Sequence, residues 1–109
     1  RIAEAQARRE GLERERDAAL IKARASLFEV AARLRHAVEE AQTLRDDLLP
    51  RMETAVTATE YAWQRGRYGY IELTEAQREQ LALRLALITA ATNAHLYRIE
   101  IERLTGDSP

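Results

Sequence analysis

Hydrophobic residues recur every seven positions through the middle of this chain, and this repeat limits the fold more than any other feature. Seven residues nearly equal two turns of α-helix, so residues at this spacing line one side of a helix and predict a packed seam. A second, weaker series runs one position later and is interrupted by Arg35 and Gln42. The stronger series consists of Leu20, Leu27, Leu34, Ala41, Leu48, Ala55 and Ala62, and the weaker one of Ile21, Phe28, Leu49, Val56 and Trp63.

Pro50 lies inside this helical run. A proline within a helix removes one backbone hydrogen bond and clashes with the preceding turn, at a cost of about 3 kcal/mol. Because Leu48 and Ala55 keep the seven-residue spacing on either side, we expect one long helix over residues 1–64 with a kink near residues 47–50. Two separate helices joined at this point are the alternative.

A second helix is expected over residues 72–105, where apolar residues form two stripes. Two stripes predict packing partners on two sides, which a two-helix hairpin does not supply. The segment from Thr74 to Gln77 has the spacing of a capping box, Gly106 is a suitable helix stop, and residues 106–109 form a tail. One stripe consists of Leu73, Ala76, Leu83, Leu87, Ala90, Ala94, Tyr97, Ile101 and Leu104, and the other of Leu81, Leu85, Ile88, Thr92, Leu96 and Ile99.

Two glycines, Gly66 and Gly69, mark the segment between the helices. The sequence therefore predicts an all-α fold, a long antiparallel and coiled-coil-like helical hairpin whose tip is residues 65–71. At about 1.5 Å per residue the helices are roughly 95 and 50 Å long, so the second reaches back only to about residue 33. The N-terminal third would project alone, and we expect the chain to be a piece of a larger helical assembly.

The composition argues against several classes of function. The chain has no cysteine and two histidines, whereas a zinc site needs three or four ligands, so we expect no metal and no cofactor. The net charge is −1, from 17 basic and 18 acidic residues, which argues against a nucleic-acid surface. The acidic pair Glu72 and Glu75 has no accompanying nucleophile or glycine-rich loop, so we expect no enzyme. The apolar runs are too short for a membrane-spanning helix.

Four segments of the chain match a known pattern in the right order. Around the turn, Trp63-Gln-Arg-Gly66 is followed by Glu72-Leu-Thr-Glu75-Ala-Gln77. Upstream stands Leu48-Leu-Pro-Arg-Met-Glu53, and downstream the stretch from Tyr97 ends in Leu-Thr-Gly106. Over nearly its whole length the chain resembles the C-terminal helical hairpin of TolC-type outer-membrane efflux proteins.

This resemblance implies a passive channel segment. Proteins of the family form homotrimers whose long helices build a hollow periplasmic cylinder below a β-barrel in the outer membrane of Gram-negative bacteria. Their hairpin tips meet a periplasmic adaptor (membrane fusion) protein, which links the channel to an inner-membrane pump. By their place in the pattern, Glu72 and Glu75 would face the pore at its entrance or gate. The tip residues that would contact the adaptor are Trp63, Arg65, Gly66, Arg67 and Tyr68.

The chain also departs from the family pattern. Arg65-Gly66-Arg67 replaces the Val-Gly-Leu or Val-Gly-Thr that many members carry at the adaptor-contacting tip, and Thr74 stands where leucine is usual. The Gly-Arg turn and the acidic run after it look more like the members that confer heavy-metal resistance than like the multidrug ones. The alternative function is a coiled-coil adaptor or a signalling or scaffold hairpin unrelated to a channel.

Overall fold

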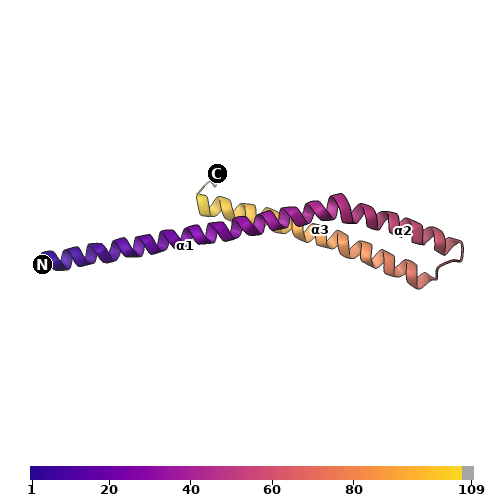
Figure 1. The fold of residues 1–109 in the computed structure, drawn as a ribbon, viewed down its shortest axis with the longest axis horizontal. Coiled ribbons are helices and arrows are strands. Elements are labelled where there is room, and N and C mark those ends of the chain that lie inside the picture. Colours follow the sequence, from indigo (N-terminus) through magenta and orange to yellow (C-terminus); the bar gives the residue numbers. More distant parts are fainter. Residues whose placement is uncertain (107–109) are drawn as a thin grey trace.

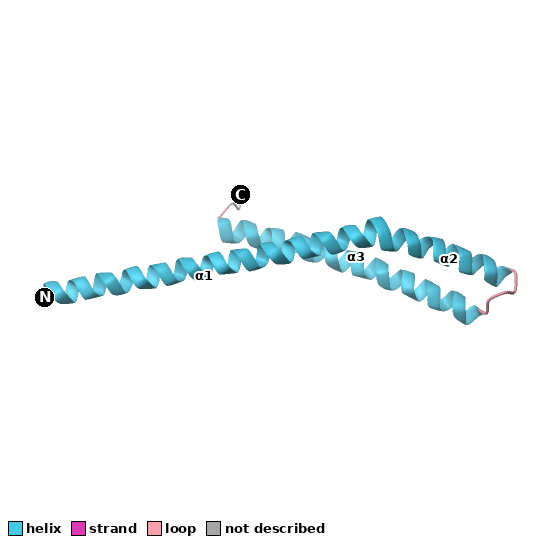
Figure 2. Cartoon of the chain, in the orientation of Figure 1, coloured by secondary structure: helices cyan, strands magenta, loops and turns pink. Residues whose placement is uncertain are grey.

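The computed structural model describes residues 1–106; the rest of the expected tail, residues 107–109, lies outside them. The chain is 93% helical, with no strand among the described residues, and forms the extended two-armed hairpin that the sequence predicts (Figure 1, Figure 2). The first arm runs through three segments without a loop, and the second arm is α3. In chain order the segments are α1 (Ile2–Thr43), the π-helical turn η1 (Leu44–Leu48), α2 (Leu49–Gln64) and α3 (Tyr70–Thr105).

The arms differ in length, so the N-terminal part of α1 projects alone. The molecule measures 93 × 27 × 16 Å, and α3 folds back along α2 and the second half of α1 (Figure 1). From residue 1 to residue 25 every residue except Gly11 is exposed. Nothing in the described chain covers this overhang, which agrees with the lengths expected from the sequence.

The seam on α3 follows a regular heptad pattern along the whole helix. Its residues alternate in steps of three and four, which keeps them on one side of the helix facing the other arm. All but one belong to the stripe predicted from the sequence; Gln80 fills the gap between Ala76 and Leu83, while Leu104 at the end is exposed. The half-buried and buried seam residues are Leu73, Ala76, Gln80, Leu83, Leu87, Ala90, Ala94, Tyr97 and Ile101.

The seam on the first arm changes from one heptad series to the other at η1. Before η1 the stronger series is at least half-buried, from Leu27 to Leu48. After η1, Ala55 of that series is exposed, and Val56 of the weaker series is buried instead. The expectation that one series continues across Pro50 is therefore wrong at Ala55, whereas near the tip Ala62 of the stronger series is half-buried and Trp63 of the weaker series is 39% exposed.

A π-helical turn accounts for this change of series. Val56 lies twelve residues after Leu44, and at about 100° per residue a regular α-helix would turn it about 120° away from Leu44. A π turn takes up one additional residue, which brings Val56 back to within about 20° of Leu44. The Leu49 N–H accordingly donates to the Leu44 carbonyl, five residues back. The arm bends here and remains helical (Figure 1).

Arginines on both sides fix where the π turn can lie. If it came earlier, Arg45 would occupy a seam position, and if it came later, Arg51 would. In the structure Arg45 and Arg51 are both exposed, and each makes a bidentate contact with a neighbouring carboxylate. Arg45 bonds Asp46 through Nε and Nη2 at 2.8 and 3.1 Å, and Arg51 contacts Asp47 at 2.9 and 3.0 Å. The hydrogen bond from Arg45 lowers the pKa of Asp46 below its ordinary value.

Deleting Pro50 should straighten the arm and leave the buried residues unchanged. With one residue fewer, the alternating spacing continues from Leu48 through Met52 to Val56, so no π turn is needed. Pro50→Ala keeps the additional residue and should keep the bend.

The chain has no cysteine, so cysteines introduced at Lys22 and Glu60 give clean spin-label pairs for a distance measurement by pulsed electron paramagnetic resonance. The distance between the two spin labels should lengthen only in the variant that lacks Pro50. A bend that survives the deletion, or that disappears in Pro50→Ala, would contradict the role given to the additional residue.

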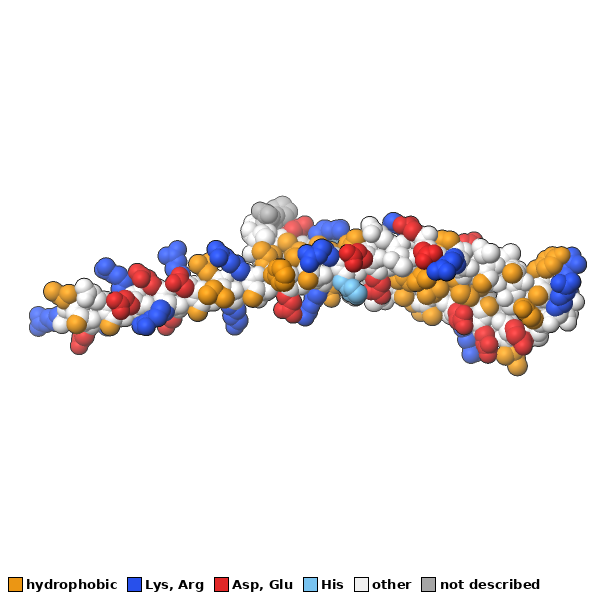
Figure 3. Space-filling view, in the orientation of Figure 1, with side chains coloured by type: hydrophobic (Ala, Val, Ile, Leu, Met, Phe, Trp, Pro, Cys, Tyr) orange, Lys and Arg blue, Asp and Glu red, His pale blue; other side chains and the backbone are white. Residues whose placement is uncertain are grey.

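The second stripe of α3 has no partner within the described chain. Its five large side chains are each about half exposed, between 47% and 61%. Phe28 on α1 is 73% exposed, and apolar surface is visible along both arms (Figure 3). A seam of this length left uncovered is the mark of a surface that packs against another helix. The exposed stripe residues are Leu81, Leu85, Ile88, Leu96 and Ile99.

We expect the isolated chain to self-associate through this stripe. Replacing both Leu85 and Ile88 with Gln should weaken association at least about tenfold, because each buried side chain of this size contributes about 1.5–3 kcal/mol. Leu12→Gln on the overhang is the matched control and should change association little. Sedimentation equilibrium measures it, and a wild-type chain that stays monomeric at high concentration would contradict the expectation.

Candidate functional site

The hairpin tip closes through a hydrogen-bonded C-terminal cap on α2. The Gly66 N–H donates to the Trp63 carbonyl at 3.0 Å, and the Arg67 N–H donates to the Ala62 carbonyl at 2.8 Å. Gly66 has φ of +73°, the left-handed conformation that this cap requires and that favours glycine. The backbone of the tip is therefore fixed locally, by residues 62–67.

Aromatic side chains join the two arms across the turn. The rings of Trp63 on α2 and Tyr70 on α3 lie 6.1 Å apart at an angle of 57°, within the range of favourable tilted ring pairs. The guanidinium carbon of Arg65, the residue that follows α2, lies 4.2 Å from the centre of the Tyr61 ring on α2, a cation–π contact. These two contacts orient the side chains that the turn exposes.

All five predicted tip residues are exposed and lie together at the end of the hairpin. Trp63 is 39% exposed and Tyr68 is 52% exposed. Arg65 and Arg67 have no ion-pair partner in residues 1–106, where only Arg33, Arg45, Arg51 and Arg103 among the arginines form one. In the space-filling view basic side chains gather at the extreme end of the molecule (Figure 3). The residues are Trp63, Arg65, Gly66, Arg67 and Tyr68.

The second arm begins at Tyr70, two residues earlier than expected. Gly69 stands at its N-cap with extended backbone, and no side chain caps the helix. The capping box predicted at Thr74 is not formed, because the Thr74 hydroxyl donates to the Tyr70 carbonyl one turn back, at 2.8 Å. Glu72 lies in the first turn with its carboxylate over Gly69, where a negative charge favours the helix dipole.

Glu72 and Glu75 are both exposed and lie on one flank of the α3 seam. Each immediately precedes a seam residue, Leu73 and Ala76 respectively. Glu79 precedes the seam residue Gln80 in the same way, so it extends the acidic stripe to three carboxylates. Glu79 is not among the residues predicted from the sequence, although its position four residues after Glu75 places it on the same helix face.

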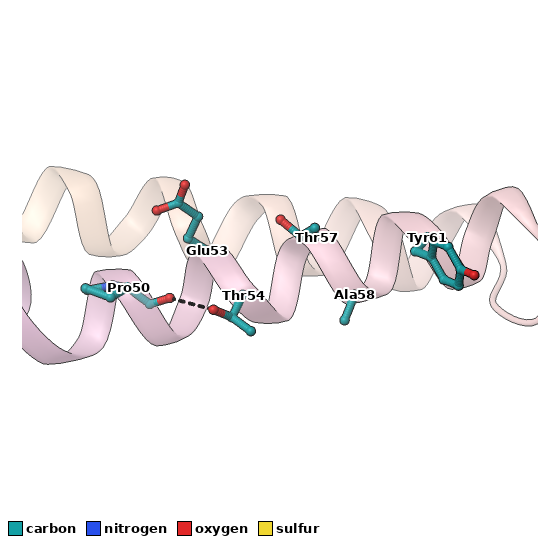
Figure 4. Close-up of a pocket in the computed structure, with 6 residues that line it drawn as sticks. All are labelled: Pro50, Glu53, Thr54, Thr57, Ala58 and Tyr61. Carbon is teal, nitrogen blue, oxygen red and sulfur yellow. Dashed lines mark hydrogen bonds between the residues drawn. The ribbon is translucent and has the colours of Figure 1, made fainter.

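Other surface features are shallow and carry no evident chemistry. One depression on α2 is lined by side chains from that helix alone, so it is an open helix face (Figure 4). The Thr54 hydroxyl there donates to the Pro50 carbonyl at 3.1 Å. Its lining residues are Pro50, Glu53, Thr54, Thr57, Ala58 and Tyr61.

His36 lines a second groove with Glu39 and Glu40. Even so, no three candidate ligands in the described part of the chain are placed to hold a metal ion. Within the same residues, no helix combines the length and apolar character needed to cross a membrane.

Comparison with protein-family models, with curated proteins and with solved structures finds no match to this chain. The resemblance to TolC-type proteins therefore rests on the sequence segments alone and stays a prediction.

Replacing Gly66 with Ala should destabilise the tip, whereas replacing Gly11 with Ala should not. Both glycines have open space where a methyl group would go, and only Gly66 has the left-handed backbone. An L-residue in that conformation costs about 1–2 kcal/mol, while alanine in a helix gains about 1 kcal/mol over glycine. Urea unfolding followed by circular dichroism at one protein concentration measures the difference. Equal effects at the two positions would contradict the importance of the cap.

Proposed function

We propose that this chain is the periplasmic helical hairpin of a TolC-type outer-membrane efflux channel, acting as a passive conduit without catalysis. The observation that carries the proposal is the tip: a glycine cap with exposed aromatic and arginine side chains, followed directly by an acidic stripe at the start of the second arm. The four matching segments fall where the family pattern requires them. In the family, the hairpin tip meets the adaptor that couples the channel to an inner-membrane pump, and here Arg65-Gly66-Arg67 would replace the Val-Gly-Leu or Val-Gly-Thr of many members.

The uncovered stripe on α3 supports a place in a helical wall. A helix inside a cylinder of helices has neighbours on both sides, so it needs two apolar stripes. Here α3 uses one stripe against the first arm and leaves the other, including Leu85 and Ile88, exposed. In a homotrimer this second stripe would pack against a neighbouring helix.

The acidic stripe gives the proposed channel an electrostatic role at its entrance. In a threefold arrangement Glu72, Glu75 and Glu79 would be repeated in each subunit and would form a ring of carboxylates. Such a ring attracts cations and hinders anions. This favours cationic cargo, in line with the likeness to the heavy-metal members of the family.

Replacing Glu72 and Glu75 with Gln in the full-length channel should lower the cation-to-anion permeability ratio severalfold and weaken block by multivalent cations. Glu102→Gln is the matched control, because Glu102 is also exposed on α3 but lies about 40–45 Å away along the helix at ~1.5 Å per residue. Single-channel recordings in planar bilayers measure both quantities.

Unchanged selectivity in the double variant would mean that these carboxylates serve only to start a helix. If the full-length protein makes no channel at all, the coiled-coil adaptor or scaffold hairpin becomes the better assignment, because the same hairpin geometry would serve it.

A further inference from the structure

At the tip, the side chain of Arg65 contacts the Tyr61 ring but has no carboxylate partner within residues 1–106. The Arg65 guanidinium lies over the Tyr61 ring, 4.2 Å from its centre. Stacking on a ring occupies the face of the guanidinium and leaves the N–H groups at its edge free to donate. Since no carboxylate in residues 1–106 pairs with Arg65, its donors are available to a ligand, and the contact with the Tyr61 ring holds them in place.

The surface around Arg65 suits a protein partner. Tyr68 is 52% exposed and Ile71 is 70% exposed, so apolar area adjoins the charge. Between Tyr61 and Ile71 the chain carries Arg65 and Arg67 and no acidic residue. Aromatic and arginine side chains in such a setting are typical interface anchors.

We propose that the tip recognises a carboxylate side chain, aspartate or glutamate, presented beside apolar side chains on a protein partner. Arg65 would donate a bidentate pair of hydrogen bonds to this carboxylate, and Arg67 would add positive charge. The inference rests on the proposed function only where it names that partner as the adaptor. A nucleic acid fits less well, because the stripe of Glu72, Glu75 and Glu79 lies next to the tip and repels a continuous row of phosphates.

The fluorescence of Trp63 can report binding at the tip, because Trp63 is the only tryptophan in the chain and lies at the tip. The probe is a short blocked peptide with one Glu flanked by Leu residues, titrated against the chain at low ionic strength and fixed protein concentration. Its counterpart, with Gln in place of Glu, is the control ligand. We expect the Glu peptide to change Trp63 fluorescence saturably and the Gln peptide to bind at least about tenfold more weakly.

Substitutions distinguish a specific binding site from nonspecific electrostatic attraction. Arg65→Gln should weaken the Glu peptide about tenfold, whereas Arg14→Gln on the overhang should leave its affinity unchanged. Tyr61→Leu, which keeps Arg65 but removes the ring, should weaken it about threefold, and Tyr61→Phe should not. Circular dichroism establishes that each variant remains helical.

Three results would overturn the proposal: equal losses in Arg65→Gln and Arg14→Gln, no effect of Tyr61→Leu, or tighter binding of a single-stranded oligonucleotide than of the Glu peptide. The channel recordings and this peptide titration test separate claims, so either one can be contradicted without the other. Specific peptide binding with no channel activity keeps the carboxylate site and removes the channel, and the reverse result removes only the carboxylate site.

Discussion

The rest of the structure depends on the seam between the two arms. On α3 the seam keeps alternating steps of three and four from Leu73 to Ile101, so the other arm has to present a matching line of apolar side chains. The first arm cannot do so with one heptad series, because Arg51 would then enter the seam. It changes series instead, through the π turn η1. The bend at Pro50 is thus the geometric consequence of matching one helix to another.

The tip is stabilised differently from the seam, because its contacts join residues close together in the sequence. The cap at Gly66, the pairing of the Trp63 and Tyr70 rings and the placement of Arg65 over Tyr61 all lie within ten residues. None of them needs the distant half of the hairpin. The shape of the tip is therefore fixed by residues 61–70 and does not depend on how the seam farther along the arms is packed.

The sequence predicted the hairpin, the α3 stripes and the exposure of the second stripe, because heptad spacing translates directly into helix faces. It did not predict the change of series, since the spacing of Leu48 and Ala55 fits an unbroken helix equally well and only Arg51 argues against it. The start of α3 was also misplaced. A threonine such as Thr74 can cap a helix or bond a carbonyl one turn back, and spacing alone does not decide between them. The roles of Glu72 and Glu75 remain predictions.

The seam between the two arms buries few large side chains. Its buried residues include three alanines, Ala37, Ala90 and Ala94, which let the arms approach closely but remove little apolar area from water. Larger side chains such as Leu85 and Ile88 point away from the seam and remain exposed. Most of the apolar surface that could stabilise α3 is therefore available only to a helix from outside the described chain. The small seam residues that let the arms approach closely therefore go together with an outer stripe of larger side chains that remains exposed.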